Sequence, residues 1–280
     1  MPQDQRFSIG DVSRICNISK KALRHYDSMQ LISSQRDTAN NYRYYTMDNL
    51  LQVPILKFYR QMGFTLEEMV QFFGHVPYVY PSLKQSFANK MQELEEQCLA
   101  LEQKQQSAEA WYELIVEAQQ VIEHHINNVS VRYMKPEHFL YQQQAFDQDL
   151  KSAIINIDWT NYLEHSGNKI CGPVILHFSS LQSRLKGTPQ PMDILQKTVL
   201  PLNHEETLQM GGCAMISCYH IGPHESLSKT YEKIIQWAQE TNYSLGQDCF
   251  ERYVTDYWTT SNTKQFVTEV LVQVTKNSMQ

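Results

Sequence analysis

The sequence predicts an α+β protein in three successive parts: a winged helix-turn-helix head, a long dimerisation helix of coiled-coil type, and a C-terminal domain of two β-α-β-β units that share an antiparallel sheet. Short capped helices and a strand–loop–strand fill the first part. Residues 82–126 contain no Pro or Gly, and the pattern beyond residue 128 repeats after about 72–75 residues. The expected domain boundaries are 1–80, 81–127 and 128–280.

The head begins with two short helices. Ser8 is a suitable N-cap for an apolar face that starts at Ile9, and Ser19 is a suitable N-cap for a second helix from Lys20 to about Met29. Two helices separated by three residues are typical of a helix-turn-helix, whose second helix lies in the major groove of DNA. A small helical bundle with solvated lysines is the alternative. The residues expected on or near the exposed surface of the second helix are Lys20, Lys21, Arg24 and Tyr26, whereas Ala22, Leu23 and His25 are expected to turn inward.

A wing follows the second helix. The stretch 33–41 is rich in Ser, Asp, Asn and Thr, and it precedes the ring-rich segment 42–45, which predicts a strand–loop–strand. Tyr42 and Arg43 bring a phenol and a guanidinium to a short, stiff ribbon, an arrangement suited to phosphate contact. Two further helices are predicted over 46–62 and 65–73.

The charge changes sign along the chain. Residues 1–60 contain nine Lys and Arg against five Asp and Glu, a balance of +4, whereas residues 81–280 contain 15 basic and 23 acidic residues, a balance of −8. A basic head on an acidic body suits a head that meets a polyanion and a body that does not.

Four segments of the head resemble the DNA-binding domain of MerR-family transcription regulators, at nearly the family's spacing. These segments are Ile9–Val12, Ala22–Asp27, Asn41–Tyr45 and Met62–Glu68. The resemblance implies that double-stranded promoter DNA is bound by a recognition helix and a wing. Two positions depart from the family's pattern, because His25 stands where an aromatic residue is common and Asn41 stands where glycine is common.

Residues 82–126 predict one helix about 65 Å long. A heptad seam runs along it at alternating spacings of three and four, through Met91, Leu94, Cys98, Leu101, Gln105, Ala108, Tyr112, Ile115, Gln119 and Ile122. A helix of this length is expected to pair with a second copy of itself, and packing on its own chain is the alternative. In MerR-family proteins antiparallel pairing of this helix makes the homodimer, so the resemblance implies a pseudopalindromic operator.

Beyond residue 128 the pattern changes to strands and two helices. Strands are expected at 128–141, 172–178, 193–202, 211–221, 246–258 and 264–274, and helices at 148–164 and 226–241. Two β-α-β-β units side by side would build a curved antiparallel sheet with helices on one face and a pocket between the units.

This half resembles the GyrI-like, multidrug-binding effector domain. The resemblance rests on Ile221–Glu225, Trp237, Gly246, Glu251–Tyr253 and Val267–Val270. Drug-sensing members of the MerR family carry this domain after the coiled coil, which is the order found here. The resemblance implies that small lipophilic cations, such as dyes and quaternary ammoniums, bind in an aromatic pocket with an acidic residue.

Glu251 is the acidic residue that the pattern singles out. Alternation along its strand places Glu251 on one face with Cys249 and Tyr253, and a carboxylate on an inner strand face is costly without a partner. Either Glu251 forms an ion pair with Arg252 or faces solvent, or, as the resemblance favours, it is the counter-charge for a bound cation. Rings add cation–π attraction to such a site. The rings ranked as ligand contacts are Tyr133, Tyr141, Tyr219, Tyr253 and Phe266.

The resemblance implies a homodimeric transcription activator. Such a regulator distorts an over-long spacer between the −35 and −10 promoter elements, so that RNA polymerase holoenzyme can engage both. A hydrolase that uses Glu251 as general base and a drug-sequestering protein are the alternatives from other classes. The absence of a nucleophile pattern argues against an enzyme.

No cofactor or metal site is expected. The six cysteines are scattered without a C-x-x-C pair, and His124 and His125, adjacent on a helix, point apart. Scattered cysteines and a polar N-terminus favour the cytoplasm, and the lack of an 18-residue apolar run argues against a membrane span.

Overall fold

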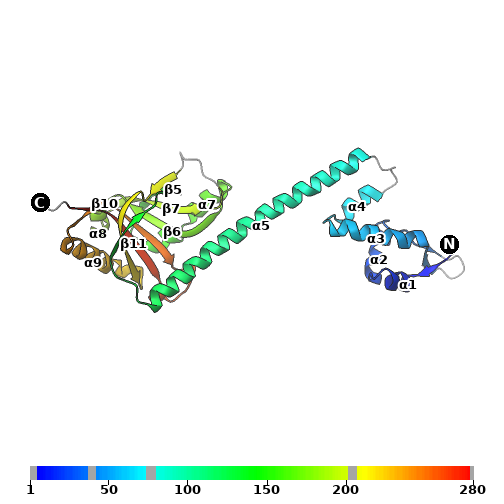
Figure 1. Ribbon diagram of the computed structural model, residues 1–280, viewed down its shortest axis with the longest axis horizontal. Coiled ribbons are helices and arrows are strands. Elements are labelled where there is room, and N and C mark those ends of the chain that lie inside the picture. The colour runs from blue at the N-terminus through cyan, green and yellow to red at the C-terminus, as the bar shows by residue number, and fades with distance from the viewer. Residues whose placement is uncertain (1–4, 37–41, 74–79, 201–206, 278–280) are drawn as a thin grey trace. The chain divides into compact units, whose positions relative to one another are not determined.

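The computed structural model describes residues 5–36, 42–73, 80–200 and 207–277 (Figure 1). These residues form two compact units, which divide at Leu99 within the helix α5 (Tyr80–Glu123). This helix is continuous over 44 residues, so the long helix predicted from the Pro- and Gly-free stretch is confirmed.

The first unit combines short helices with a three-stranded sheet of order β1-β3-β2. Its elements before α5 are β1 (Phe7–Ser8), α1 (Ile9–Ile15), α2 (Lys20–Ser28), β2 (Gln35–Arg36), β3 (Arg43–Tyr45), α3 (Met47–Gln61) and α4 (Leu66–Phe73). Ser8 forms a capping box with Asp11, and the Ser19 side chain accepts a hydrogen bond from the backbone N–H of Ala22. The expected helix-turn-helix and wing strands are therefore present. The wing tip, including Asn41, lies outside the described residues.

The buried side of α2 differs from the prediction at two positions. Tyr26 is only 9% exposed and belongs to the core of this unit, whereas His25 is exposed. Helix geometry explains the difference, because Tyr26 follows the fully buried Leu23 by three residues and so shares its face, whereas His25 follows it by two.

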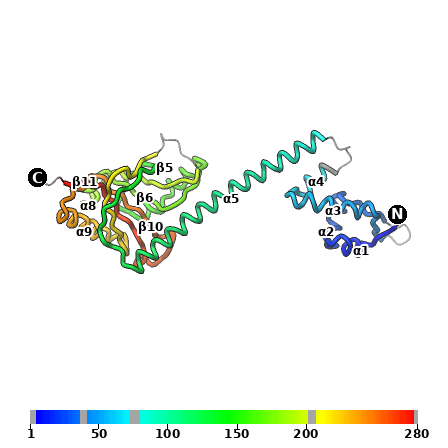
Figure 2. The backbone as a smooth tube through the Cα atoms, in the orientation of Figure 1, coloured from blue at the N-terminus to red at the C-terminus, as the bar shows by residue number. Residues whose placement is uncertain are grey.

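The second unit is a sheet domain with helices (Figure 2). Its strands are β4 (Ser130–Met134), β5 (Glu137–Phe146), β6 (Ile170–Phe178), β7 (Gln190–Thr198), β8 (Thr207–Met210), β9 (Cys213–Ile221), β10 (Tyr243–Thr255) and β11 (Val267–Lys276). Its helices after α5 are α6 (Leu150–Ile154), α7 (Ile157–His165), α8 (Leu181–Lys186) and α9 (Leu227–Glu240), with 3-10 turns η2 (His224–Ser226) and η3 (Thr263–Gln265).

The two predicted repeats are visible in the strand order β4-β9-β11-β10-β6-β7-β5-β8, in which every pairing is antiparallel. The first repeat supplies β6-β7-β5 and the second repeat supplies β10-β11-β9, so the repeats meet where β6 pairs with β10. The outer strands exchange places: β4 pairs with β9 of the second repeat, and β8 pairs with β5 of the first.

Helices cover both faces of this sheet rather than one. Residues of α6, α7, α8 and α9 pack with Phe178, Cys249 and Tyr253 in one core cluster. The end of α5 packs through Leu114 on Val254, whose side chain points to the opposite face because strand side chains alternate.

One local prediction was wrong, and one helix was not foreseen. The single helix expected at 148–164 is broken into α6 and α7, because the Asn156 side chain caps α7 by accepting the N–H of Trp159. The helix α8 was not expected; the Ser180 side chain caps its start and Gly187 ends it with a φ of 63°.

Candidate functional site

The exposed side of α2 carries three of the residues expected to contact DNA. Lys20, Lys21 and Arg24 are exposed, and the wing residue Tyr42 is 75% exposed. Tyr26 was expected on this surface, but its ring packs in the core of the unit, so it is not placed to contact DNA with its ring.

Arg43 links the wing to α2. Its Nε lies 3.1 Å from a carboxylate oxygen of Asp27. The second oxygen of Asp27 accepts hydrogen bonds from the backbone N–H and the hydroxyl of Ser34, both at 2.8 Å. These contacts hold the end of α2 against β3 and against Ser34, the residue before β2.

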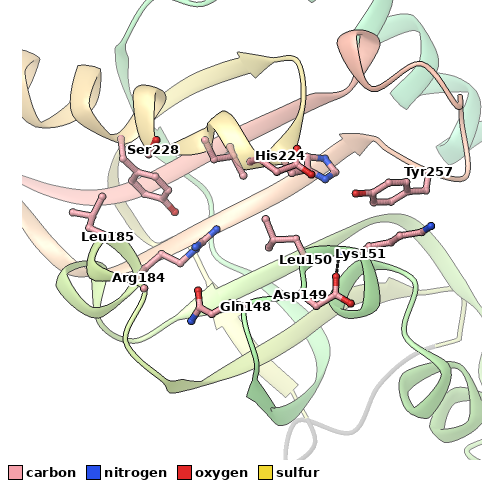
Figure 3. A pocket seen from close by; sticks show the side chains of 13 residues that line it. Gln148, Asp149, Leu150, Lys151, Arg184, Leu185, His224, Ser228 and Tyr257 are labelled. Carbon is pink, nitrogen blue, oxygen red and sulfur yellow. Dashed lines mark hydrogen bonds between the residues drawn. The ribbon is translucent and has the colours of Figure 1, made fainter.

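The second unit contains a cavity of about 510 Å³ between α6, α8, α9 and the segment that follows β10 (Figure 3). Its wall combines aromatic, apolar and charged side chains of both signs. The lining residues used below are Asp149, Arg184, His224, Glu225, Tyr231 and Tyr257.

Glu251 lies directly behind this wall and is fully buried. Arg184 donates from Nε to Oε1 at 2.7 Å and from Nη2 to Oε2 at 3.3 Å. The hydroxyl of Tyr231 donates to Oε1 at 2.7 Å, and that of Tyr253 donates to Oε2 at 2.6 Å. Burial by itself would raise the pKa of the Glu251 carboxyl, but the charge and hydrogen bonds of Arg184 and the two phenols outweigh it and lower the pKa. Glu251 is therefore an ionised carboxylate, and each of its two oxygens accepts hydrogen bonds from Arg184 and from one phenol.

The guanidinium of Arg184 also lies over two rings. Its central carbon is 5.0 Å from the centroid of Phe178 and 5.5 Å from that of Phe146. The side chain is only 13% exposed. An internal cation thus already has the carboxylate and the rings that a bound cation would need.

His224 brings an unused hydrogen-bonding group to the cavity. Its ring stacks on Phe266 at 4.8 Å and meets Tyr253 edge-on at 5.0 Å, and the residue is 3% exposed. Neither ring nitrogen has a hydrogen-bond partner among the described residues. Burial lowers the pKa of His224 to about 4, so the ring is neutral at pH 7.

The five rings expected to line the pocket do not come together. Tyr253 and Phe266 lie beside His224, near Glu251. Tyr133 is 67% exposed on the edge strand β4. Tyr141 packs with the cluster of Phe250 on the other face of the sheet, and Tyr219 also lies on that face.

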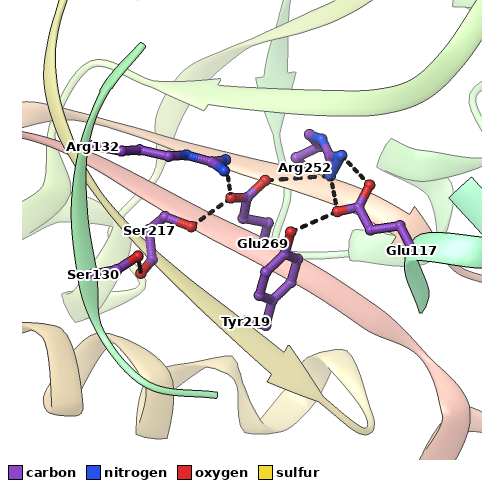
Figure 4. A network of polar contacts seen from close by, with 7 residues as sticks. All are labelled: Glu117, Ser130, Arg132, Ser217, Tyr219, Arg252 and Glu269. Atoms are coloured by element: carbon purple, nitrogen blue, oxygen red, sulfur yellow. Dashed lines mark hydrogen bonds and ion pairs between the residues drawn. The ribbon is translucent and has the colours of Figure 1, made fainter. Parts of the chain in front are cut away.

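Arg252 is not the partner of Glu251, because consecutive strand residues point to opposite faces. Its guanidinium binds the Glu117 carboxylate of α5 through two contacts, one of them 2.7 Å long, and lies 3.3 Å from Glu269 (Figure 4). Tyr219 donates to the same Glu117 at 2.7 Å, and Arg132 forms an ion pair with Glu269. This polar network joins the sheet to α5 on the face opposite Glu251.

Three residues of this site were missed from the sequence. Tyr231 lies on the buried face of the predicted helix 226–241, and His224 lies in the segment Ile221–Glu225, so the sequence pattern pointed to both residues. No sequence pattern pointed to Arg184, because α8 is only six residues long and Arg184 lies 67 residues before Glu251.

Within the described part of the chain, no group of three or more His, Cys, Asp and Glu side chains is placed to hold a metal ion. No helix among those residues has both the length and the apolarity to cross a membrane.

Known proteins resemble this chain in both halves. Residues 8–45 match the MerR family regulatory proteins, and residues 193–275 match the GyrI-like small molecule binding domain. The multidrug-efflux transporter 2 regulator of Bacillus subtilis is 19% identical over 279 residues, which cover 96% of each chain. The HTH-type transcriptional regulator CueR of Escherichia coli O6:H1 is 32% identical over 92 residues, which cover 32% of this chain and 68% of that protein. A solved structure of an EcmrR–DNA complex covers 97% of this chain and 100% of that chain, at 18% identity and a TM-score of 0.46.

The two family matches and the two curated regulators confirm the resemblances found in the sequence, and they agree with the prediction that the chain is not an enzyme, since both relatives are named as regulators. The chain belongs to the MerR family of regulatory proteins and carries a GyrI-like small molecule binding domain in its C-terminal half.

Proposed function

We propose that this regulator is a homodimeric, ligand-responsive transcription activator whose C-terminal domain senses small lipophilic cations. The observation that carries the ligand class is Glu251, a fully buried, ionised carboxylate directly behind a cavity of about 510 Å³ whose wall includes the rings of Tyr231 and Tyr257. A buried carboxylate beside rings attracts a delocalised cation by charge and cation–π interactions, and it places few demands on the shape of the ligand.

Promoter DNA is the proposed partner of the first unit. Lys20, Lys21 and Arg24 on α2 and Arg43 on the wing supply the positive groups, with Arg43 held by Asp27. Contacts of this kind to phosphates position a protein, and contacts of the recognition helix read bases. The proposed response is a distortion of an over-long promoter spacer that aligns its elements for RNA polymerase holoenzyme.

The homodimer is proposed from the seam on α5. Met91, Leu94, Leu101, Tyr112 and Ile115 are each at least 40% exposed in the single chain. Apolar side chains that recur every three and four residues along a helix are suited to burial against a second helix. Two heads joined in this way would bind the two halves of a twofold-symmetric operator.

The DNA arm is tested by mobility shift of a fragment from upstream of the gene over a series of salt concentrations. Arg43→Ala is expected to weaken all sequences alike and to reduce the salt slope by about one, as loss of a phosphate contact does. Lys264→Ala, which removes an exposed positive charge from the C-terminal unit, is the matched control. Unchanged salt dependence in Arg43→Ala would exclude that phosphate contact.

The ligand arm is tested by titration of a fluorescent lipophilic cation, rhodamine 6G, into the wild type and Glu251→Gln. The variant retains the shape and one acceptor oxygen for the phenols but removes the charge, so its affinity for the dye is expected to fall about tenfold or more. Equal affinity of the two proteins would remove Glu251 as the cation anchor.

A further inference from the structure

We infer that Arg184 is a resident cation: it occupies the place on Glu251 that a ligand cation takes, and it must leave the carboxylate before such a ligand can bind there. This inference rests on the proposed function, because it takes Glu251 to be the ligand's anchor. It makes Arg184 the residue that sets which cations the cavity accepts and how tightly.

Arg184 has the surroundings expected for a cation that is bound between a carboxylate and aromatic rings. Its guanidinium binds both oxygens of Glu251 and lies within 5.5 Å of the ring centroids of Phe146 and Phe178. Figure 3 shows the side chain reaching from α8 into the cavity. A ligand cation that approached Glu251 from the cavity would meet this guanidinium first.

The remaining partners of Glu251 do not depend on Arg184. Tyr231 comes from α9 and Tyr253 from β10 itself, and each donates its hydroxyl to a different oxygen of the carboxylate. When the guanidinium moves away, the carboxylate keeps one phenol donor on each oxygen. The anchor thus stays formed for the incoming cation.

The Arg184 side chain also has an alternative position available to it. The helix α8 is only six residues long, and its neighbour Leu185 is 40% exposed. The carboxylates of Asp149 and Glu225 line the same cavity. A guanidinium that left Glu251 would therefore reach water or another carboxylate without unfolding the sheet.

The ion pair makes the exchange selective for charge. Removing one partner of a buried pair leaves an uncompensated charge, which is strongly unfavourable. A neutral ligand cannot compensate Glu251, whereas a second cation can. The exchange favours bulky organic cations. The guanidinium regains its hydration when it leaves the buried pair, whereas a bulky organic cation loses little hydration when it takes that place.

The test is calorimetric titration of tetraphenylphosphonium into the full chain as wild type, Arg184→Met and Glu251→Gln. Arg184→Met leaves the carboxylate without its internal cation, so it is expected to bind this cation about tenfold more tightly than the wild type. Lys186→Met removes an exposed positive charge from the same helix and serves as the control, with the wild-type affinity expected. Melting curves report whether each variant is folded.

The outcomes separate the inference from the proposed function. If Glu251→Gln binds weakly but Arg184→Met binds no more tightly than Lys186→Met, the resident cation is refuted and the Glu251 anchor stands. If Glu251→Gln binds as well as the wild type, the anchor itself is refuted. Should Arg184→Met fail to fold, Arg184→Lys keeps the charge without the two-pronged contact and is expected to bind more tightly than the wild type. Unchanged or weaker binding by this variant would overturn the inference.

Discussion

Glu251 and Arg252 are consecutive residues of β10, yet they form ion pairs on opposite faces of the sheet: Glu251 with Arg184 at the cavity, and Arg252 with Glu117 of α5. A shift of the β10 backbone at Glu251 must therefore move the residue that holds α5. We therefore expect occupation of the cavity to alter the contact between Arg252 and the long helix.

Arg252→Met is expected to uncouple the helix from the cavity. The variant loses both contacts to Glu117 but leaves the Glu251 cluster intact, so tetraphenylphosphonium should still bind with the wild-type affinity. In the wild type, ligand binding should change amide hydrogen exchange in α5 residues 100–123, and in Arg252→Met most of that change should vanish.

Lys197→Met is the control for that measurement. It breaks the exposed Lys197–Glu137 pair on the same sheet, which does not involve α5, and should leave the exchange response intact. An exchange response in Arg252→Met equal to that of the wild type would show that the Glu117 contact does not carry the signal.

The buried Arg184–Glu251 pair should appear as strong coupling in folding stability. Arg184→Met and Glu251→Gln are each expected to lower the free energy of unfolding by about 3–5 kcal/mol, because each leaves one side of a buried pair. The double variant should lose less than the sum of the two, since it buries no unpaired charge. Urea unfolding at pH 7 measures all four proteins, and additive losses would contradict the coupling.

The Arg184–Glu251 pair is expected to stabilise the folded state less at acidic pH. The pKa of Glu251 is lower in the folded chain than its ordinary value of 4.5, so the folded state binds this proton less tightly than the unfolded state. Its contribution to stability is present above pH 4.5 and is lost as the pH falls through the folded pKa. The stability advantage of the wild type over Glu251→Gln should accordingly shrink below pH 4.5, and an advantage that stays constant there would refute the lowered pKa.

The contacts that the sequence predicted well are local ones. Ser8 and Ser19 cap their helices through bonds that span three residues, and such patterns are legible without a fold. The two repeats were also predicted, because each repeat has the same internal order of elements. The alternation that placed Glu251 on an inner face was correct as well.

The partners across the sheet could not be predicted in the same way. Arg184 lies 67 residues from Glu251 and Glu117 lies 135 residues from Arg252, so no local spacing links either pair. Tyr141 and Tyr219 are aromatic strand residues like Tyr253, but only the register of the sheet decides which face each ring occupies. Their separation from Glu251 was therefore invisible in the sequence.

Asp256→Asn should stabilise the folded chain at neutral pH. Asp256 is 1% exposed, and burial raises the pKa of its carboxyl to about 6, although the backbone N–H of Trp258 lowers it in part. Because the unfolded group ionises near pH 3.8, the folded state is penalised as the pH rises above that value, by up to about 3 kcal/mol once the pH exceeds 6.

Urea unfolding of Asp256→Asn at pH 7.5 and pH 4 checks this. A gain of about 2–3 kcal/mol is expected at pH 7.5 and almost none at pH 4, because the wild-type carboxyl is then largely protonated in the folded state. Glu232→Gln, at an exposed position of α9, should show no such pH dependence. A gain of equal size at both pH values would mean that packing rather than ionisation is responsible.

Leu101→Glu should separate the proposed homodimer into single chains. Leu101 is 63% exposed in the middle of the α5 seam, and pairing of two copies would bury its side chain. A carboxylate at that position would have to be buried without a partner, which opposes pairing strongly.

Sedimentation velocity should show the wild type at twice the chain mass and Leu101→Glu at the chain mass. The control Gln106→Glu, at an exposed position off the seam, should still be paired. Since each head alone binds one half of an operator, the single chain should also bind DNA far more weakly than the pair. A variant that sediments as the wild type does would show that the two chains do not meet along this seam.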